Sequence, residues 1–170
     1  MLELARRRAV GATVALDPGG FWEGWERTFF GTSIALSIRL VRAIRFALPA
    51  LTATPAGRAL LFAQFSARPW ALPRELALTE LRTFVASPVF DAVLRELARG
   101  PAQEGLPRGA ATQPIIIGWG RQDRVCLPNQ AARALARYPD ARLHWFERCG
   151  HFPQWDAPAA TVRLILEATA

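Results

Sequence analysis

Asp123 and His151 are the two residues of this chain whose types and positions suit proton-transfer chemistry. Asp123 follows the segment 114–120, in which a proline, three isoleucines and two glycines predict a short strand buried on both faces, as in a parallel sheet. His151 follows a second strand-like segment at 141–146. Because ligands of open α/β sheets bind at the carboxyl ends of the strands, we expect both side chains on one rim. There the imidazole can accept the proton of a nucleophile while the carboxylate orients the ring.

The elements that would position these side chains resemble the end of an α/β-hydrolase. The resemblance rests on Trp119-Gly120-Arg121-Gln122-Asp123, then Pro128, then Gly150-His151 with Asp156 and Pro158. In that family the penultimate strand carries the triad acid and the loop after the last strand carries the histidine, in this order. The resemblance implies an α/β class, namely a partial α/β-hydrolase fold with about three parallel strands and a helical cap insertion. It also implies that Asp123 and His151 are catalytic.

The family's nucleophile stands in a G-x-S-x-G turn, and this sequence contains no such motif. The nearest segment, 31–35, lacks the second glycine. Glu3-Leu4-Ala5-Arg6-Arg7 is similar to the end of the family's helix that follows the nucleophile, so we expect the nucleophile turn to precede Met1. The resemblance thus implies the C-terminal portion of a carboxylic-ester hydrolase or a related small-molecule hydrolase, inactive as this chain alone.

Two points about the function stay open at this stage. The nucleophile of the full-length parent can be a serine or, as in dehalogenases and epoxide hydrolases, an aspartate, and the reaction changes with it. The alternatives to an enzyme are a non-catalytic remnant that acts as a binding protein and a small unrelated basic domain. For the enzyme, we expect a small apolar ester-like substrate, no cofactor and no metal.

Four further residues are candidates for the site. Asp17, after the strand-like segment 10–16, is an alternative triad acid because some family members carry the acid there. Its other interpretation is the opening of a glycine-rich turn. Phe21, Trp22 and Trp119 are candidates for an apolar substrate pocket, and their other interpretation is ordinary packing.

The organisation of the chain follows from its helix signals. We expect residues 1–18 and 88–170 to form the C-terminal part of the hydrolase core, and residues 19–87 to form the helical cap. Helix starts are predicted at Ser33, Thr54, Leu72, Ser87 and Pro128, and Asp156 is predicted to cap the closing helix. The inward-facing stripes predicted near the carboxyl end are Val89, Val93, Leu94 and Leu97 on one helix, and Val162, Ile165 and Leu166 on the closing helix.

The composition is that of an ordinary globular protein, with 51% hydrophobic and 21% charged residues. The net charge of +7 comes from arginines without a single lysine, which indicates a coding bias rather than a selected phosphate-binding face. Apart from Arg39, Arg42 and Arg45 on one predicted helix face, the arginines are scattered, so we expect no nucleic-acid partner. The same three charges interrupt the most apolar window, so no membrane association is expected. Without a signal-peptide pattern, the chain is predicted to be cytoplasmic.

The remaining predictions concern structure rather than catalysis. Cys126 and Cys149 form neither a disulfide framework nor a metal knuckle by their spacing. We expect Cys149 to be a small packed residue and His144 to be a structural residue of a strand. In the family's sheet order, the strand at 10–16 loses an upstream neighbour, and its free edge carries no charged residue. Self-association through that exposed strand edge is therefore predicted.

Overall fold

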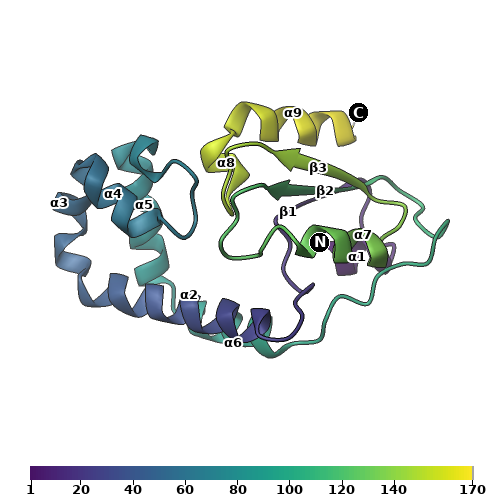
Figure 1. The fold of residues 1–170 in the computed structure, drawn as a ribbon, viewed down its shortest axis with the longest axis horizontal. Helices are drawn as coiled ribbons and strands as arrows, with labels where there is room; N and C mark the ends of the chain where they lie inside the picture. Colours follow the sequence, from purple (N-terminus) through teal and green to yellow (C-terminus); the bar gives the residue numbers. More distant parts are fainter. Residues whose placement is uncertain (170) are drawn as a thin grey trace. The chain divides into compact units, whose positions relative to one another are not determined.

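Three parallel strands form the only sheet within residues 1–169, which are the residues that this computed structural model describes (Figure 1). They are β1 (Thr13–Leu16), β2 (Ile115–Gly120) and β3 (Arg142–Phe146), in the order β1-β2-β3. Val14 lies opposite Ile116 and Gly118 lies opposite His144. All six residues of β2 are buried, as expected for a β-branched central strand covered on both faces. The predicted α/β class with three parallel strands is confirmed.

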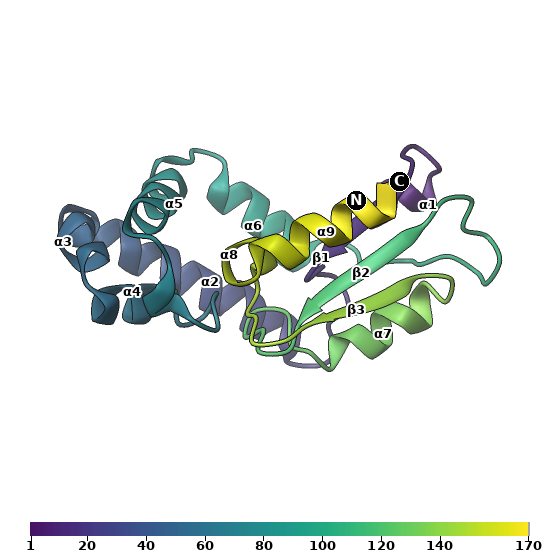
Figure 2. The same ribbon diagram turned by 90° about the horizontal axis from the view of Figure 1, so that it is seen from above.

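In the described part of the chain, four helices pack around the sheet. They are α1 (Leu2–Arg6), α7 (Gln130–Arg137), the short α8 (Pro153–Asp156) and α9 (Pro158–Thr169). Helix α9 packs on one face, where Leu164 and Ala168 join Ile116 and Phe146 in a buried cluster. Helix α7 lies on the other side of the strands in both views (Figures 1 and 2). The sheet is thus a buried middle layer. The loops at the carboxyl ends of its strands are not covered by these helices and can present functional side chains.

The inward face of α9 differs from the prediction. Val162, Ile165 and Leu166 are 55%, 40% and 62% exposed. The buried residues are Thr161, Leu164 and Ala168, which recur at helical spacing on a different side of the helix. Apolar side chains surround this helix, so periodicity alone did not identify the face that the sheet covers.

The chain divides into two compact units. Unit 1 comprises 1–21, 65–67 and the chain from Pro101 on, and therefore holds the sheet. Unit 2 comprises 22–64 and 68–100. Its helices are α2 (Glu26–Ala43), α3 (Leu48–Ala53), α4 (Pro55–Phe62), α5 (Arg74–Ala86) and α6 (Phe90–Arg99), with 3₁₀ turns at Arg45–Ala47 and Pro69–Ala71 (Figure 1).

The boundaries of unit 2 differ from the predicted cap at its carboxyl end. Residues 88–100 were expected in the core, whereas α6 packs against α2 within unit 2. Arg42 makes an ion pair there with Asp91 at 2.8 Å, and the helices approach so closely at Gly31 that a β-carbon on it would lie 3.1 Å from that of Ala98. An excursion of three residues, 65–67, returns to unit 1 in the middle of the predicted cap.

Helix signals in unit 2 succeeded in part. Thr54 caps α4 as predicted, because its hydroxyl accepts a hydrogen bond from the Gly57 backbone at 3.0 Å. Ser33 caps nothing, since α2 begins seven residues earlier at Glu26 and the Ser33 hydroxyl donates to the Phe30 carbonyl within the helix. The predicted inward stripe of α6 is wrong: no residue of this helix is buried, and Val89, Val93 and Leu97 are all more than half exposed.

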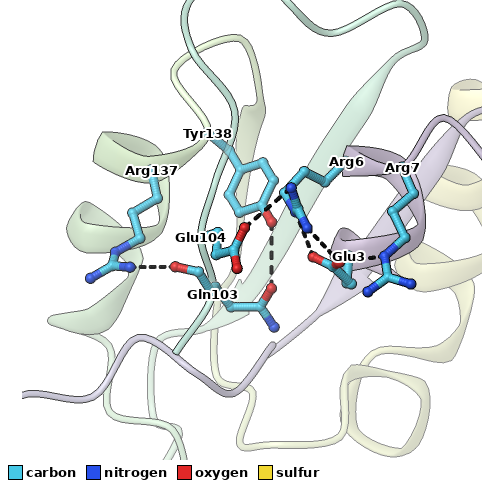
Figure 3. Close-up of polar contacts among 7 residues, drawn as sticks. All are labelled: Glu3, Arg6, Arg7, Gln103, Glu104, Arg137 and Tyr138. Carbon is cyan, nitrogen blue, oxygen red and sulfur yellow. Dashed lines mark hydrogen bonds and ion pairs between the residues drawn. The ribbon is translucent and has the colours of Figure 1, made fainter. Parts of the chain in front are cut away.

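A polar network in unit 1 joins α1 to the return segment, the residues around Gln103 and Glu104 that precede β2 (Figure 3). Glu3 pairs with Arg6 at 2.7 Å and with Arg7 at 2.5 Å, and Arg6 also reaches Glu104 at 3.2 Å. The hydrogen bonds from Arg6 and Arg7 lower the pKa of Glu3 to about 2. Beside it, Tyr138 and Arg137 donate to Gln103. The network joins α1, the return segment and the end of α7 on the side of the molecule shown in Figure 3.

Candidate active site

The loops that follow β2 and β3 are joined by a continuation of the strand ladder. The Arg121 backbone nitrogen donates to the Phe146 carbonyl at 3.0 Å, and the Gln122 nitrogen donates to the Cys149 carbonyl at 2.9 Å. Past the last strand residue, Gly120 lies close to the facing loop: a β-carbon there would be 2.1 Å from the carbonyl oxygen of Gly150. Only glycine allows this approach. The two loops therefore run together from the carboxyl edge of the sheet.

This arrangement brings Asp123 and His151 into direct contact. The Nδ1 atom of His151 lies 2.9 Å from Oδ2 of Asp123. The Asp123 side chain is fully buried, and that of His151 is 18% exposed. With Nδ1 held by the carboxylate, Nε2 is the ring nitrogen that can exchange a proton with a reacting group. The structure thus places the two predicted residues together, and their catalytic role stays a prediction.

The other oxygen of Asp123 is held by the backbone of its own turn. Oδ1 accepts hydrogen bonds from the nitrogen of Val125 at 2.7 Å and from that of Cys126 at 3.1 Å. Such a local Asx-type turn fixes the orientation of the carboxylate before any ligand binds. One oxygen is therefore committed to the fold and the other to His151.

Asp17, the alternative acid, lies at the carboxyl end of β1 and does not bond to His151 in the described structure. Its Oδ1 accepts from the Gly120 nitrogen at 2.7 Å, while Oδ2 is buried without a hydrogen-bond donor among the described residues. Burial, reinforced by the charge of the neighbouring Asp123, raises the pKa of Asp17 to about 10. The raised pKa favours the protonated form of Asp17 at neutral pH, with the Asp123 carboxylate as its neighbour. The interpretation of Asp17 as a plain turn opener misses this buried role.

Asp156 organises the loop that carries His151. Its carboxylate accepts from the backbone nitrogens of Gly150 at 2.7 Å and Ala67 at 2.8 Å, and from the hydroxyl of Ser66 at 2.5 Å. The predicted role as the cap of the closing helix is therefore wrong, since Asp156 ends α8 and binds Ser66 and Ala67 instead. Because Asp156 is 4% exposed, this three-way contact is a buried clasp.

The segment 65–67, which Asp156 holds, also supports His151 directly. The backbone nitrogen of His151 donates to the carbonyl of Phe65 at 2.8 Å. A β-carbon at Gly150 would lie 2.6 Å from that same carbonyl oxygen, so the residue before the histidine has to be a glycine. The Phe152 ring contacts both the His151 ring, at 4.9 Å between centroids, and the Phe65 ring, at 5.9 Å. Residues far apart in the sequence thus set the position of the imidazole.

The predicted pocket residues are packed in the interior or in the other unit. Phe21 and Trp119 are 2% and 0% exposed and their rings are 6.4 Å apart, with the Trp119 indole donating to the Cys126 carbonyl. Trp22 belongs to unit 2 and stacks on Phe30 at 5.0 Å. The burial of Phe21 and Trp119 and the ring contact of Trp22 favour the ordinary packing role that sequence analysis had left as the alternative.

The two residues expected to be structural behave as such. Cys149 is fully buried in the cluster beneath α9. His144 lies within β3 against Phe146, and partial burial lowers its pKa.

Cys126 lies beside the Asp123–His151 pair, a position that sequence analysis did not identify. Its sulfur, a carboxylate oxygen of Asp123 and a ring nitrogen of His151 all lie within 4.8 Å of one another, a set of ligand types that a zinc ion accepts. Since Asp123 and His151 already share a hydrogen bond, an ion there would have to replace their common proton. The spacing of Cys126 in the sequence does not predict that it lies near His151, because only the turn after Asp123 brings it there.

Comparisons with known proteins bear on the family and the fold of the chain. The sequence model of the Alpha/beta hydrolase family matches residues 1–164. A 2-hydroxy-6-oxononadienedioate/2-hydroxy-6-oxononatrienedioate hydrolase of Cupriavidus pinatubonensis (strain JMP 134 / LMG 1197) is 35% identical over 77 residues, which are 44% of this chain and 27% of that protein. Among the described residues, no helix has both the length and the apolar character needed to cross a membrane.

Solved structures support the same fold. MGS-M2, an alpha/beta hydrolase enzyme from a Medee basin deep-sea metagenome library, superposes on 99% of this chain with a TM-score of 0.66 at 12% identity, and the match covers 60% of that chain. The 2-hydroxy-6-oxo-6-phenylhexa-2,4-dienoate hydrolase of Rhodococcus sp. strain RHA1 matches 72% of this chain and 47% of its own, with a TM-score of 0.52 at 20% identity. The chain spans less than two thirds of the length of the relatives it matches. With the family's sequence pattern running through almost its whole length, this chain belongs to the α/β-hydrolase family.

Proposed function

We propose that this chain supplies the acid and the histidine of an enzyme that hydrolyses a small carbonyl compound, an ester or a related substrate. The observation that carries the proposal is the contact of 2.9 Å between the buried Asp123 carboxylate and Nδ1 of His151. In this role Nε2 of His151 takes the proton of the nucleophile and returns it to the leaving group, while Asp123 stabilises the imidazolium that forms. Unit 1 then acts as part of the hydrolase core and unit 2 as its helical cap.

The substrate class is proposed from the partial relatives. The Cupriavidus protein is named as a hydrolase of 2-hydroxy-6-oxononadienedioate, a small oxo compound. Its similarity covers less than half of this chain, so it supports a small carbonyl substrate and not that particular compound. The choice between an ester and another carbonyl compound depends on the nucleophile, which this sequence does not carry in a G-x-S-x-G motif. We therefore propose that the chain alone turns over no ester.

The acid–histidine contact can be tested on the chain as it is. It contains two histidines, so ¹⁵N-labelled imidazoles give only two sets of signals, and His144 serves as the internal reference. We expect His151 to show an Nδ1 proton shifted to low field by its bond to Asp123, and we expect Asp123→Asn to abolish that resonance. The matched control is Asp140→Asn, which changes an exposed carboxylate bound to the Gly109 nitrogen. A low-field resonance that survives Asp123→Asn would show that the pair does not form in solution.

The catalytic part of the proposal needs an activity assay. The chain should hydrolyse p-nitrophenyl acetate no faster than its His151→Ala variant, because His151 has no activated nucleophile to serve. If its gene encodes an in-frame upstream segment with a nucleophile turn, the protein extended by that segment should gain activity. Asp123→Asn should then lower turnover by about ten-thousandfold through the wrong histidine tautomer. If Asp17→Asn abolishes that activity while Asp123→Asn leaves it intact, the assigned acid is wrong. An extended protein that binds but never hydrolyses a carbonyl compound would favour the non-catalytic alternative.

A further inference from the structure

Unit 2 contains an open cavity of about 680 Å³ between α2 and α6, the two helices that lie along each other within this unit (Figure 1). Its volume falls in the range of pockets that hold small molecules. Small side chains let the helices approach at its floor, where a β-carbon at Gly31 would be 3.1 Å from that of Ala98. All residues that line the cavity belong to unit 2, so the cavity is complete within it.

The charges around this cavity are strongly unbalanced. Five arginines line it against one acid, Asp91: they are Arg27, Arg39, Arg42, Arg95 and Arg99. Asp91 is occupied by Arg42, which donates to both of its oxygens at 2.8 and 3.0 Å. Within the described part of the chain, Arg39, Arg95 and Arg99 make no ion pair or hydrogen bond. A concave surface with this surplus concentrates anions from solution.

Arg27 shows how this cavity differs from an ordinary solvent-exposed surface rich in arginine. Its guanidinium donates to the Gly100 carbonyl and stacks on Trp22 at 5.9 Å, so its position is fixed. Its Nε atom is nevertheless buried and has no hydrogen-bond partner among the described residues. A buried N–H of a charged group is costly to leave unsatisfied, and a bound anion is the acceptor that removes this cost.

The ligand class follows from where the arginines stand. Arg39 and Arg42 are one helical turn apart on α2, while Arg95 and Arg99 are one turn apart on α6, so cations face the cavity from both sides. The planar guanidinium fork matches carboxylate and phosphate oxygens. We propose that this cavity is a binding site for a small molecule with at least two carboxylate or phosphate groups, one held by each helix. The site shares no residue with the Asp123–His151 pair.

Inorganic pyrophosphate is the phosphate probe and succinate the carboxylate probe, each titrated into the whole chain by calorimetry. Acetate serves as the single-charge reference. We expect both dianions to bind more tightly than acetate, and we expect the affinity to weaken as salt rises to about 0.15 M, where charges are screened within about 8 Å. The double variant Arg95→Gln/Arg99→Gln should weaken dianion binding by at least about tenfold. The matched control, Arg74→Gln/Arg82→Gln, removes the same charge from exposed positions of α5 in the same unit and should change the affinity by less than about twofold.

Three results would overturn the proposal. One is equal weakening in the two double variants, because net charge and not the cavity would then govern binding. Another is a failure of the dianions to bind more tightly than acetate. The third is retention on anionic lipid vesicles or on a short single-stranded oligonucleotide without any binding of the soluble dianions, since the arginines would then serve a macromolecular surface. Circular dichroism of each variant confirms that it folds, and Arg39→Gln, on the other helix, provides an independent variant if the double variant does not.

Discussion

Replacing Asp17 by asparagine should stabilise the folded chain at neutral pH, although it alters a residue buried beside the candidate site. Asparagine keeps the contacts of the protonated acid: its Oδ1 can accept from the Gly120 nitrogen, as Asp17 does at 2.7 Å, and its amide can donate toward Asp123. Asp17 has a φ angle of +45°, a conformation that asparagine tolerates better than most residues. What the substitution removes is the ability to ionise when the chain unfolds.

The magnitude follows from the pKa of this group. Burial, with a contribution from the charge of Asp123, raises the pKa of Asp17 from 3.8 to about 10. Because the folded-state pKa is raised, the stability contributed by the bound proton is fully present below pH 3.8 and is lost as the pH rises toward 10. At pH 7 the loss spans about three pH units of about 1.4 kcal/mol each, so it amounts to about 4 kcal/mol. The variant avoids this loss.

Urea unfolding measured by tryptophan fluorescence from about pH 4 to about pH 9 tests the reasoning. The two proteins should have nearly equal unfolding free energies at the acid end. The advantage of Asp17→Asn should then grow by about 1.4 kcal/mol per pH unit. Asp140→Asn, at an exposed carboxylate, should show no such slope. A variant that is less stable at every pH, or that differs from the parent by a constant amount, would refute a protonated Asp17.

Two other predictions concern the clasp and the sheet edge. Asp156→Ala leaves the donors of Gly150, Ala67 and Ser66 without their acceptor, so the free energy of unfolding by urea should fall by about 4 kcal/mol. The exposed control Asp140→Ala should lose less than about 1 kcal/mol. A loss as small as the control's would mean that the clasp is not formed. Val14→Pro should reduce the mass of the self-associated chain found by light scattering. The backbone nitrogens of Thr13 and Asp17 face β2, so the backbone nitrogen of Val14 faces the free edge of β1, where a proline cannot donate a hydrogen bond. If the Val14→Pro and Val14→Ala variants have equal mass, this edge does not mediate self-association.

The sheet was predictable because its signals are local. A proline, three isoleucines and two glycines predict β2 without reference to the rest of the chain, and the parallel arrangement follows from the helices between the strands. The positions of Asp123 and His151 were predictable for the same reason, since each follows directly on a strand. Their mutual contact then comes from the parallel arrangement of the strands themselves.

The features that escaped prediction depend on distant partners. Asp156 has the sequence context of a helix cap, and only the return of residues 65–67 to the sheet shows that it is a clasp. Asp17 has the context of a turn, and its raised pKa comes from its burial and then from Asp123, which is far away in the sequence. On α9, apolar residues occur on several sides, so the choice of Leu164 over Leu166 as the buried residue is made by the sheet. Local patterns carry no information about such partners.

The return of residues 65–67 to unit 1 limits how the helical region can be exchanged between relatives. A graft that replaces everything from 22 to 100 as one cassette would discard the Phe65 carbonyl that holds the His151 backbone and the two neighbours that Asp156 binds. Such a chimera would lose the support of its histidine even though the histidine loop itself was untouched. Grafts confined to 22–64 or to 68–100 keep that support, so the helical region is better treated as two separately exchangeable segments that flank a fixed tripeptide.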